Sequence, residues 1–241
     1  MRRVEEQWGT VISVDAPDIT DASVLDECYA WFQRIDDLFS TWRDDTEIMR
    51  LGRGELERAD TSPEVREVLE LSEQMRLESD GAFDITAAQA PFDPSGIVKG
   101  WAVQRAGDML GAAGSTRYFI NAGGDIAVRG SWRVGIQHPW KRDKVAAVVE
   151  ASDCGVATSG RYERGDHVID PRTGEPAIGL ASVTVIGPDL GIADAFATAV
   201  VVLGADAGMR WLTTRVGYDG MCITDDETVI VTQGFDRYRV S

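Results

Sequence analysis

The sequence predicts a mixed α+β protein, and the order of its periodic segments is the main reason. Helical periodicity dominates residues 23–113, strand-like alternation dominates 118–186, and two helices and a hairpin follow. This order lacks the regular βαβ alternation of a doubly wound sheet. With 241 residues and no internal repeat, low-complexity stretch or linker, we expect one domain over residues 1–241. Two intimately packed lobes are the alternative.

One strand and three helices are expected in the first half of the chain. Residues 4–14 alternate well enough for a strand, and residues 23–39 repeat apolar side chains at helical spacing with acids opposite. Ser62-Pro63 supplies an N-cap and a first-turn proline for a helix that runs to about Ser79. A third helix is expected over residues 97–113.

Short strands bounded by Gly, Pro or charged turns dominate the second half. Strands are expected at residues 118–121, 132–137, 145–151 and 183–186, helices at 192–203 and 207–215, and a closing hairpin from strands 220–224 and 228–232.

Composition excludes several function classes. The chain has 24 Lys and Arg against 40 Asp and Glu, a formal charge of −16, which argues against nucleic acid or an anionic membrane as the main partner. Two histidines and three widely spaced cysteines exclude a CxxC zinc site, a multi-His metal centre and a disulfide framework.

The hydropathy of the chain predicts no membrane insertion. No stretch reaches the ~18 apolar residues of a membrane span, and no apolar run follows Arg2-Arg3 as a secretory signal requires. We therefore expect a cytoplasmic protein, with an exported chain that has lost its signal as the alternative.

Residues 93–100, Asp-Pro-Ser-Gly-Ile-Val-Lys-Gly, read as a glycine-bearing loop that enters a helix. Such a junction presents free backbone N–H groups to a phosphate, and Lys99 adds a positive charge. The alternative is an ordinary helix start with a surface lysine. The segment is not a Walker A loop, because the GxxxxGK[ST] spacing is absent.

Residues 121–125, Asn-Ala-Gly-Gly-Asp, follow the strand that ends at Ile120. Paired glycines allow close approach of a ligand to the backbone, and they equally favour a hairpin turn. The two interpretations stand side by side.

His167 is a candidate proton carrier. It lies three residues before Asp170 and a Pro-Arg-Thr-Gly turn, and histidine is the side chain suited to moving a proton near neutral pH. The alternative is a structural histidine, and His138, before Pro139, fits that inert role better.

Asp194 and Thr198 stand four residues apart and therefore share one face of the predicted helix. Their neighbours are apolar, and a buried carboxylate needs a partner. A hard cation such as Mg²⁺ would satisfy both oxygen groups. The alternative is that Asp194 acts as an N-cap near the helix start.

Seven segments in chain order resemble the FAD:protein FMN transferases, the ApbE-like family. They are the segments Phe39 to Trp42 (FSTW), Gly81 to Thr86 (GAFDIT), Asp93 to Gly100 (DPSGIVKG), Asn121 to Asp125 (NAGGD), Ala157 to Gly160 (ATSG), His167 to Gly174 (HVIDPRTG) and Asp194 to Thr198 (DAFAT). The resemblance extends from Trp8 to Gly204.

The resemblance implies a fold, a reaction and a site. The ApbE-like fold has mixed, mostly antiparallel sheets packed with helices around a deep FAD cleft. Its enzymes cleave FAD, attach FMN to a Ser or Thr hydroxyl of an acceptor flavoprotein and release AMP. By resemblance, His167 is the base, and Mg²⁺ is held by Gly96, Asp194 and Thr198. FAD contacts are expected at Trp8, Trp42, Ala82, Phe83, Asp84, Asp93, Lys99 and Ile169.

The chain departs from the family pattern in several places. Trp42 replaces the usual tyrosine, Trp8 replaces a methionine, Pro94-Ser95 replaces Leu-Gly, and Val98 replaces alanine. Residues 87–92 form a shorter segment than the family norm. The alternatives to transfer are FAD hydrolysis to FMN and AMP, and FAD binding or storage without chemistry. A homodimer is one option for the assembly.

Overall fold

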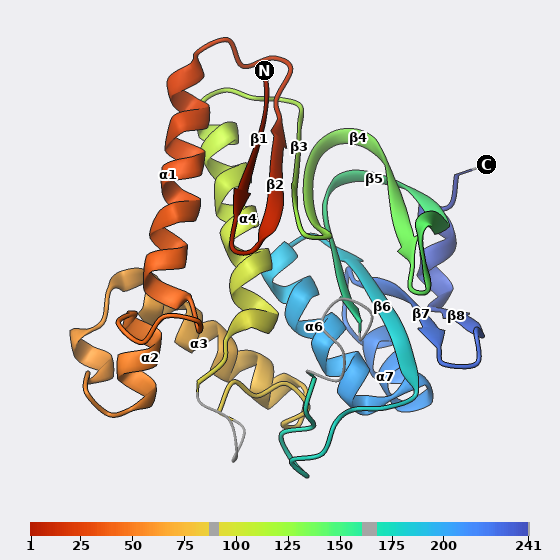
Figure 1. Ribbon diagram of the computed structural model, residues 1–241. Coiled ribbons are helices and arrows are strands. Elements are labelled where there is room, and N and C mark those ends of the chain that lie inside the picture. Colours follow the sequence, from red (N-terminus) through yellow and green to blue (C-terminus); the bar gives the residue numbers. More distant parts are fainter. Residues whose placement is uncertain (87–91, 161–167, 241) are drawn as a thin grey trace.

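In the part of the chain that the structure describes, the backbone forms one eight-stranded sheet in which every neighbouring pair is antiparallel, and helices pack on it (Figure 1). A computed structural model describes residues 1–86, 92–160 and 168–240. The strands follow one another across the sheet in chain order: β1 Arg2–Gln7, β2 Thr10–Asp15, β3 Tyr118–Ala122, β4 Asp125–His138, β5 Lys141–Gly160, β6 Leu180–Gly187, β7 Asp219–Thr224 and β8 Val229–Val231. The predicted α+β class and antiparallel sheet are confirmed.

The described helices fall into two groups along the chain. Those between β2 and β3 are α1 Ala22–Phe39, α2 Glu47–Gly52, the short 3-10 helix η1 Arg58–Asp60, α3 Pro63–Glu78 and α4 Ser95–Ala112. Those after β6 are α6 Leu190–Leu203, α7 Ala205–Thr213 and the 3-10 helix η2 Gln233–Tyr238.

Local capping explains where the long helices begin. Asp21 accepts a hydrogen bond from the Ser23 N–H at the start of α1, and Ser62 accepts one from Val65 N–H at the start of α3, directly before Pro63. The predicted helices over 23–39 and 63–79 are therefore confirmed. Helix α2 is absent from the sequence prediction, because six residues are too few to show a helical period.

The predicted strand over residues 4–14 is wrong in one respect, since the segment is a hairpin. Trp8 (φ 57°) and Gly9 (φ 67°) both adopt left-handed backbone conformations, and they reverse the chain between β1 and β2. The apolar residues Val4, Trp8, Ile12 and Val14 keep one parity in the sequence, although Val4 is exposed in the structure, so periodicity alone did not reveal the break.

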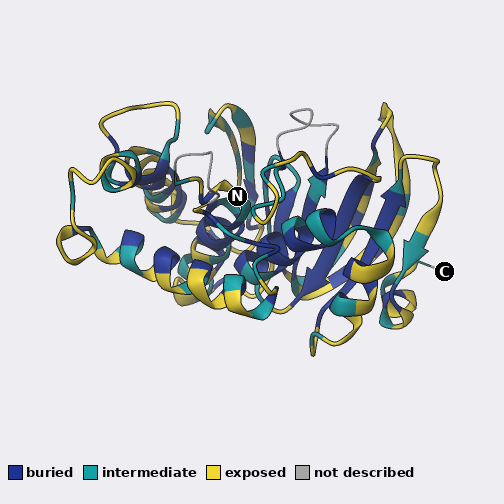
Figure 2. Cartoon of the chain, turned by 90° about the horizontal axis from the view of Figure 1, so that it is seen from below, coloured by how far each residue is buried: buried dark blue, intermediate teal, exposed yellow. Residues whose placement is uncertain are grey.

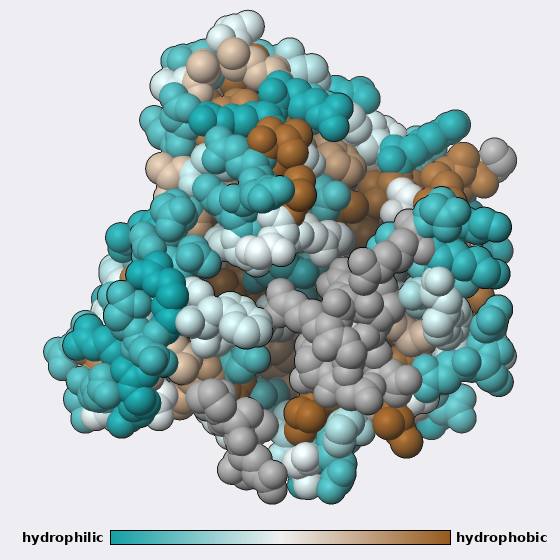
Figure 3. Space-filling view, in the orientation of Figure 1, coloured by the Kyte–Doolittle hydropathy of each residue, from teal (hydrophilic) through white to brown (hydrophobic). Residues whose placement is uncertain are grey.

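The sheet buries apolar side chains on both of its faces. The larger core joins α1, α3, α4 and α6 to the sheet, around residues such as Phe32, Leu110 and Val200. The smaller core lies between the curled strands β4 and β5 and the end of the chain, around Val149 and Phe235. In Figure 2 the central strands are mostly buried, whereas the outer sides of the helices are exposed. The helices at the left of Figure 3, from α1 to α3, present a mainly hydrophilic surface.

Strands β4 and β5 are longer than predicted. Residues 132–137 and 145–151 were expected as separate short strands, and they are the outer parts of strands of 14 and 20 residues. The register shifts near Gln137 and again between Val128 and Ser131, so bulges interrupt the alternation that the sequence prediction relied on.

Among the described helices, none is long and apolar enough to cross a membrane.

Asp18 ties the β2–α1 connection to the end of α4. Its carboxylate accepts hydrogen bonds from Ser115 Oγ at 2.7 Å and from the Thr116 and Arg117 N–H groups at 2.6 Å and 3.2 Å. These donors favour the charged form, and they hold the pKa of Asp18 well below its usual range. The anion therefore stabilises the fold at neutral pH.

We expect Asp18→Ala to lower the melting temperature at pH 7. A depressed carboxyl pKa contributes stability that is fully present above the unfolded pKa of about 4 and is lost as the pH falls through the folded pKa. The difference in melting temperature between the wild type and the variant should therefore shrink below about pH 4. Thermal unfolding followed over a pH series measures this, and a constant difference would remove Asp18 as its source.

Candidate active site

A single cavity of about 1370 Å³ brings the predicted site residues together. It is lined by α4, α6, the ends of β3, β4 and β5, and the segments after α1 and α3. Every described residue of the predicted site lines it: Trp8, Trp42, Ala82, Phe83, Asp84, Asp93, Gly96, Lys99, Ile169, Asp194 and Thr198. His167 lies outside the described residues. The roles of these residues toward FAD and Mg²⁺ stay predictions.

Two tryptophans lie at the cavity in different settings. Trp8 is fixed, since its indole N–H donates to the Phe32 carbonyl at 2.9 Å and its ring meets the Phe32 ring edge-on at 5.3 Å. Trp42 follows the end of α1, and 89% of its surface is exposed. The cavity thus has one anchored aromatic residue and one whose face is available to a flat ring.

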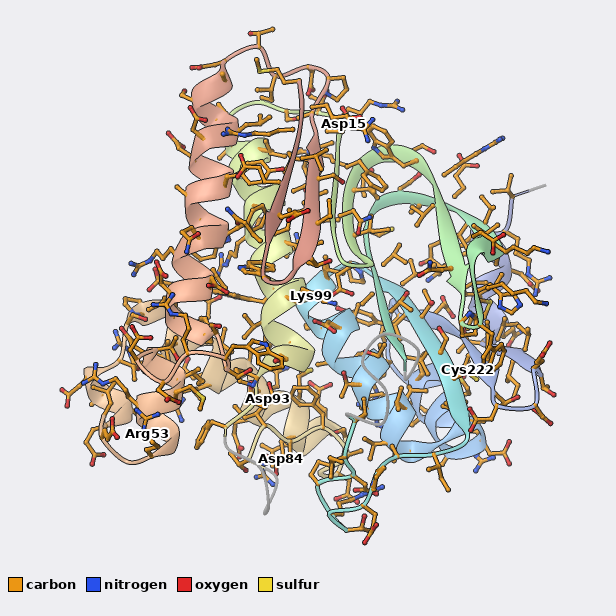
Figure 4. The ribbon with its side chains drawn as sticks, viewed as in Figure 1. Asp15, Arg53, Asp84, Asp93, Lys99 and Cys222 are labelled. Atoms are coloured by element: carbon orange, nitrogen blue, oxygen red, sulfur yellow. The ribbon has the colours of Figure 1, made fainter. Side chains whose placement is uncertain are left out.

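The segment after α3 shapes the lower wall. Ala82 and Phe83 are buried, and the Phe83 N–H donates to Ser79 Oγ at 2.9 Å. Asp84 accepts from the Thr86 N–H at 2.8 Å, and Asp93 accepts from the Ser95 N–H at 3.0 Å. Figure 4 shows Asp84 and Asp93 near the start of α4, below Lys99. Both carboxylates therefore order their own turns.

Helices α4 and α6 approach closely at two glycines. A β-carbon on Gly96 would lie 2.9 Å from Thr198 Oγ1, and one on Gly100 would lie 2.5 Å from the Leu190 carbonyl oxygen and 2.8 Å from Asp194 Cβ. The Gly100 N–H donates to Asp194 Oδ2 at 3.1 Å. The absence of side chains at these positions therefore brings the α4 backbone next to the oxygen groups of α6.

Asp194 is not an N-cap. Asp189 caps α6 by accepting from the Ile192 N–H, and Asp194 lies in the second turn with 3% of its surface exposed. Thr198 follows one turn later, and its hydroxyl is 3.3 Å from Ser159 Oγ on β5. The predicted shared face of Asp194 and Thr198 is therefore present, and it is turned toward the cavity.

Asp125 is the site residue that the sequence analysis missed. It is fully buried, its Oδ2 forms an ion pair with Lys99 Nζ at 3.1 Å, and its Oδ1 accepts from the Thr158 N–H at 3.3 Å. Lys99 is thus not a surface lysine, since only 22% of its side chain is exposed. The signal was present as the last residue of the Asn-Ala-Gly-Gly-Asp segment, but only the tertiary fold pairs it with Lys99.

Two buried carboxyl groups share one cationic neighbour in this cluster. Burial raises the pKa of both Asp125 and Asp194, and in Asp194 the nearby Asp125 raises it further. Lys99 lowers both pKa values but does not outweigh burial. The cluster therefore holds more negative charge than its own side chains balance when both carboxyl groups ionise.

The donor set fits a hard divalent cation. Asp194 offers a carboxylate, Thr198 a hydroxyl and Gly96 a backbone carbonyl, which are the oxygen ligands that Mg²⁺ prefers. A divalent cation there would also balance the buried negative charge. No cluster of three or more His, Cys, Asp or Glu side chains suited to a metal occurs among the residues that the structure describes. A metal would therefore depend on hydroxyl, carbonyl and water oxygens beside one carboxylate.

Residues 121–125 form the predicted hairpin turn, and the approach of a ligand to this backbone stays a prediction. Gly123 (φ 56°) and Gly124 (φ 98°) form the tight turn between β3 and β4, and Asn121 accepts from the Gly124 N–H at 3.0 Å. The same Asn121, Gly123 and Gly124 line the cavity. The turn therefore also exposes backbone to whatever occupies the site.

The comparisons with known proteins agree with this geometry. The sequence model of the ApbE family matches residues 8–91 and 87–221. The chain is 35% identical over 133 residues to an FAD:protein FMN transferase of Vibrio cholerae, 38% over 130 residues to one of Escherichia coli strain K12, and 34% over 181 residues to one of Treponema pallidum. These matches cover 48%, 47% and 65% of this chain. They span 40%, 37% and 50% of the relatives, so the match reaches half of their length or less.

Solved structures share the whole fold. The ApbE protein from Thermotoga maritima superposes with a TM-score of 0.89 at 21% identity, covering 100% of this chain and 99% of that one. The flavin transferase ApbE from Vibrio cholerae gives 0.86 at 22% identity, covering 99% and 98%. Because the family model matches most of the sequence and the fold agrees over its full length, the chain belongs to the ApbE family.

Proposed function

We propose that the protein is a Mg²⁺-dependent FAD:protein FMN transferase, which moves FMN from FAD to a Ser or Thr hydroxyl of an acceptor flavoprotein and releases AMP. The observation that supports this most is the buried Asp125–Lys99–Asp194 cluster at the wall of a cavity that also holds an anchored and an exposed tryptophan. The names of the curated relatives support the same reaction.

The lining of the cavity offers groups suited to both chemical parts of FAD. Trp8, Trp42 and Phe83 provide aromatic surface for flat ring systems. Lys99 places a cation beside the region where a pyrophosphate would meet the start of α4, and Asp125 orients its ammonium group. Such an arrangement positions the phosphate groups and leaves the acceptor hydroxyl to enter from the open side.

Asp194, Thr198 and the Gly96 carbonyl would hold Mg²⁺, whose role when bound is to neutralise charge on the phosphates. In the proposed reaction the acceptor oxygen forms a bond to the FMN phosphorus, the bond to the AMP oxygen breaks, and AMP leaves. His167 takes the hydroxyl proton, because an alcohol is too weakly acidic to attack as an alkoxide at neutral pH. Phosphoryl transfer depends mainly on such positioning and charge balance.

Incubation with FAD, Mg²⁺ and a purified acceptor flavoprotein that carries a Ser/Thr acceptor motif tests the proposal. Transfer produces a fluorescent flavin band that stays on the acceptor in a denaturing gel, together with AMP. AMP and free FMN without a labelled acceptor would instead indicate hydrolysis. Binding of FAD with neither product would indicate a storage protein, and it would overturn the proposed reaction.

We expect His167→Ala to lower turnover by about 10²–10⁴-fold, the usual contribution of a general base, while FAD binding stays near its wild-type strength. His138→Ala is the matched control, because His138 is the other of the two histidines in the chain and does not line the cavity. Rates of AMP release and equilibrium FAD binding should be measured for both variants. Full activity of His167→Ala would remove this residue from the mechanism.

A further inference from the structure

The outer part of the β4–β5 hairpin has a charge opposite to that of the rest of the molecule. We call residues 133–148 the hairpin tip. It contains four of the 24 Lys and Arg residues of the chain but only one of its 40 Asp and Glu residues. The remainder of the chain is therefore more acidic than its net charge of −16 suggests, and the hairpin tip is a local basic region on it.

Lysines of the hairpin tip also differ from most basic side chains in their contacts. Many arginines elsewhere pair with acids, such as Arg34 with Glu64 at 2.7 Å and Arg53 with Glu55 at 2.7 Å. Lys141 and Lys144 are exposed, and neither forms an ion pair with any residue that the structure describes. Their charges are therefore available to a partner.

Exposed apolar side chains accompany these lysines. Trp140 is 46% exposed, Val145 57% and Val148 41%. The Trp140 and His138 ring centroids lie 5.7 Å apart, and the backbone N–H of Trp140 donates to His138 Nδ1 at 3.3 Å, so the residue is held in place at the turn. A fixed, exposed tryptophan beside free cations is the composition of a protein-binding surface.

The hairpin tip adjoins the candidate active site. Val134, Ile136 and Gln137, on the β4 side of the tip, line the cavity. His138 and Trp140 follow directly in the chain, at the turn between β4 and β5 (Figure 1). A polypeptide that inserts a hydroxyl into the cavity can therefore rest its neighbouring residues on the hairpin tip.

We propose that the hairpin tip is the docking surface for the acceptor protein and that it binds an acidic segment flanking the acceptor hydroxyl. This inference rests on the proposed transferase function. An acidic segment is repelled by most of this acidic molecule and attracted by Lys141 and Lys144, which steers it toward the cavity. Trp140 and Val145 add contact with its apolar side chains.

Basic and aromatic residues together also suit an anionic lipid surface. The position of the hairpin tip favours a protein as its partner. Residues of β4, which forms one side of the tip, also line the cavity that must receive a protein hydroxyl. Vesicles containing an anionic phospholipid form a separate arm of the test, so that the two kinds of partner are distinguished.

Fluorescein-labelled peptides provide the direct test. Two peptides share a central Thr, one with Asp and Glu flanks and the other with Gln flanks, and fluorescence polarisation measures their binding to the whole protein. In Lys141→Glu/Lys144→Glu, binding of the acidic peptide should weaken by about tenfold or more, since two attractive charges become repulsive. Raised salt should weaken wild-type binding in the same direction.

The matched control is Arg50→Glu/Arg210→Glu. It changes the net charge by the same amount at two exposed residues that do not line the cavity. The control should bind the acidic peptide with less than twofold change, and Trp140→Ala should weaken it without altering net charge. Equal effects of the two double variants would overturn the proposal, as would equal binding of the two peptides or binding to the anionic vesicles alone.

AMP release from FAD with the Gln-flanked peptide as the hydroxyl donor separates this inference from the proposed function. The Lys141→Glu/Lys144→Glu variant should release AMP at the wild-type rate, because neither lysine lines the cavity. If no protein releases AMP, the proposed reaction fails while the peptide titration still decides the docking surface. If AMP release is normal and the peptide titration shows no preference, only the docking surface fails.

Discussion

Replacing Asp194 by alanine is expected to reduce Mg²⁺-dependent FAD cleavage by about 10³-fold or more, because a metal that balances phosphate charge contributes several kcal/mol to the transition state. Asp194 is the buried carboxylate of the donor set, and α4 approaches it so closely that Gly100 donates its N–H to Oδ2. The remaining Thr198 and Gly96 oxygens are neutral and would bind a cation weakly.

The same variant should not lose stability in the absence of metal. Burial and the neighbouring Asp125 both disfavour the Asp194 carboxylate, so its removal relieves an unfavourable interaction in the folded state. Thermal unfolding should show Mg²⁺ raising the melting temperature of the wild type but not of Asp194→Ala. The control is Asp189→Ser, which removes a carboxylate from the same helix and keeps a capping side chain. Retained Mg²⁺-dependent cleavage in Asp194→Ala would refute the metal assignment.

Gly100→Ala is expected to destabilise the protein by about 1–3 kcal/mol, the usual cost of overpacking a tight contact. The added methyl group would lie 2.5 Å from the Leu190 carbonyl oxygen, which is backbone and has no rotamer to adopt. Relief requires that α4 and α6 move apart. That movement would also separate the Gly100 N–H from Asp194, so FAD cleavage should fall together with stability.

Gly111→Ala is the matched control within the same helix. Its methyl group would meet the end of the Arg129 side chain, which can swing away. Without a backbone clash, the better helix propensity of alanine should leave stability unchanged or raise it by about 0.5–1 kcal/mol. Denaturant unfolding of the two variants measures the contrast. An equal effect at both positions would show that helix propensity, and not the α4–α6 contact, decides the outcome.

Local signals made much of the fold predictable from the sequence. Ser62-Pro63 marks the start of α3 through a cap and a fixed φ, and both act within a few residues. The Trp8-Gly9 turn was missed because a tryptophan in a left-handed conformation contradicts its usual preference, and contact with Phe32 stabilises it from a distant part of the chain. Bulges in β4 and β5 likewise depend on pairing, which periodicity does not report.

The candidate site shows the same contrast between local signals and contacts formed by distant parts of the chain. Asp194 and Thr198 were identifiable because four residues on one helix define a shared face. Asp125 was not identifiable, because its place in the site depends on an ion pair with Lys99, 26 residues away in the chain, and on complete burial in the folded protein. Spacing along the chain predicts pairs within an element, whereas pairs between elements depend on how α4, α6 and the sheet pack.

The exposure of Trp42 has a practical consequence for optical experiments. Of the seven tryptophans, Trp42 is the one that is 89% exposed at the cavity, while Trp101 is buried and Trp140 lies on the hairpin tip. Emission from an indole in water is shifted to the red and is quenched by dissolved iodide. A flavin placed against this ring would shield it from iodide and quench its fluorescence by energy transfer. Trp42 is therefore an intrinsic fluorescent reporter of cavity occupancy.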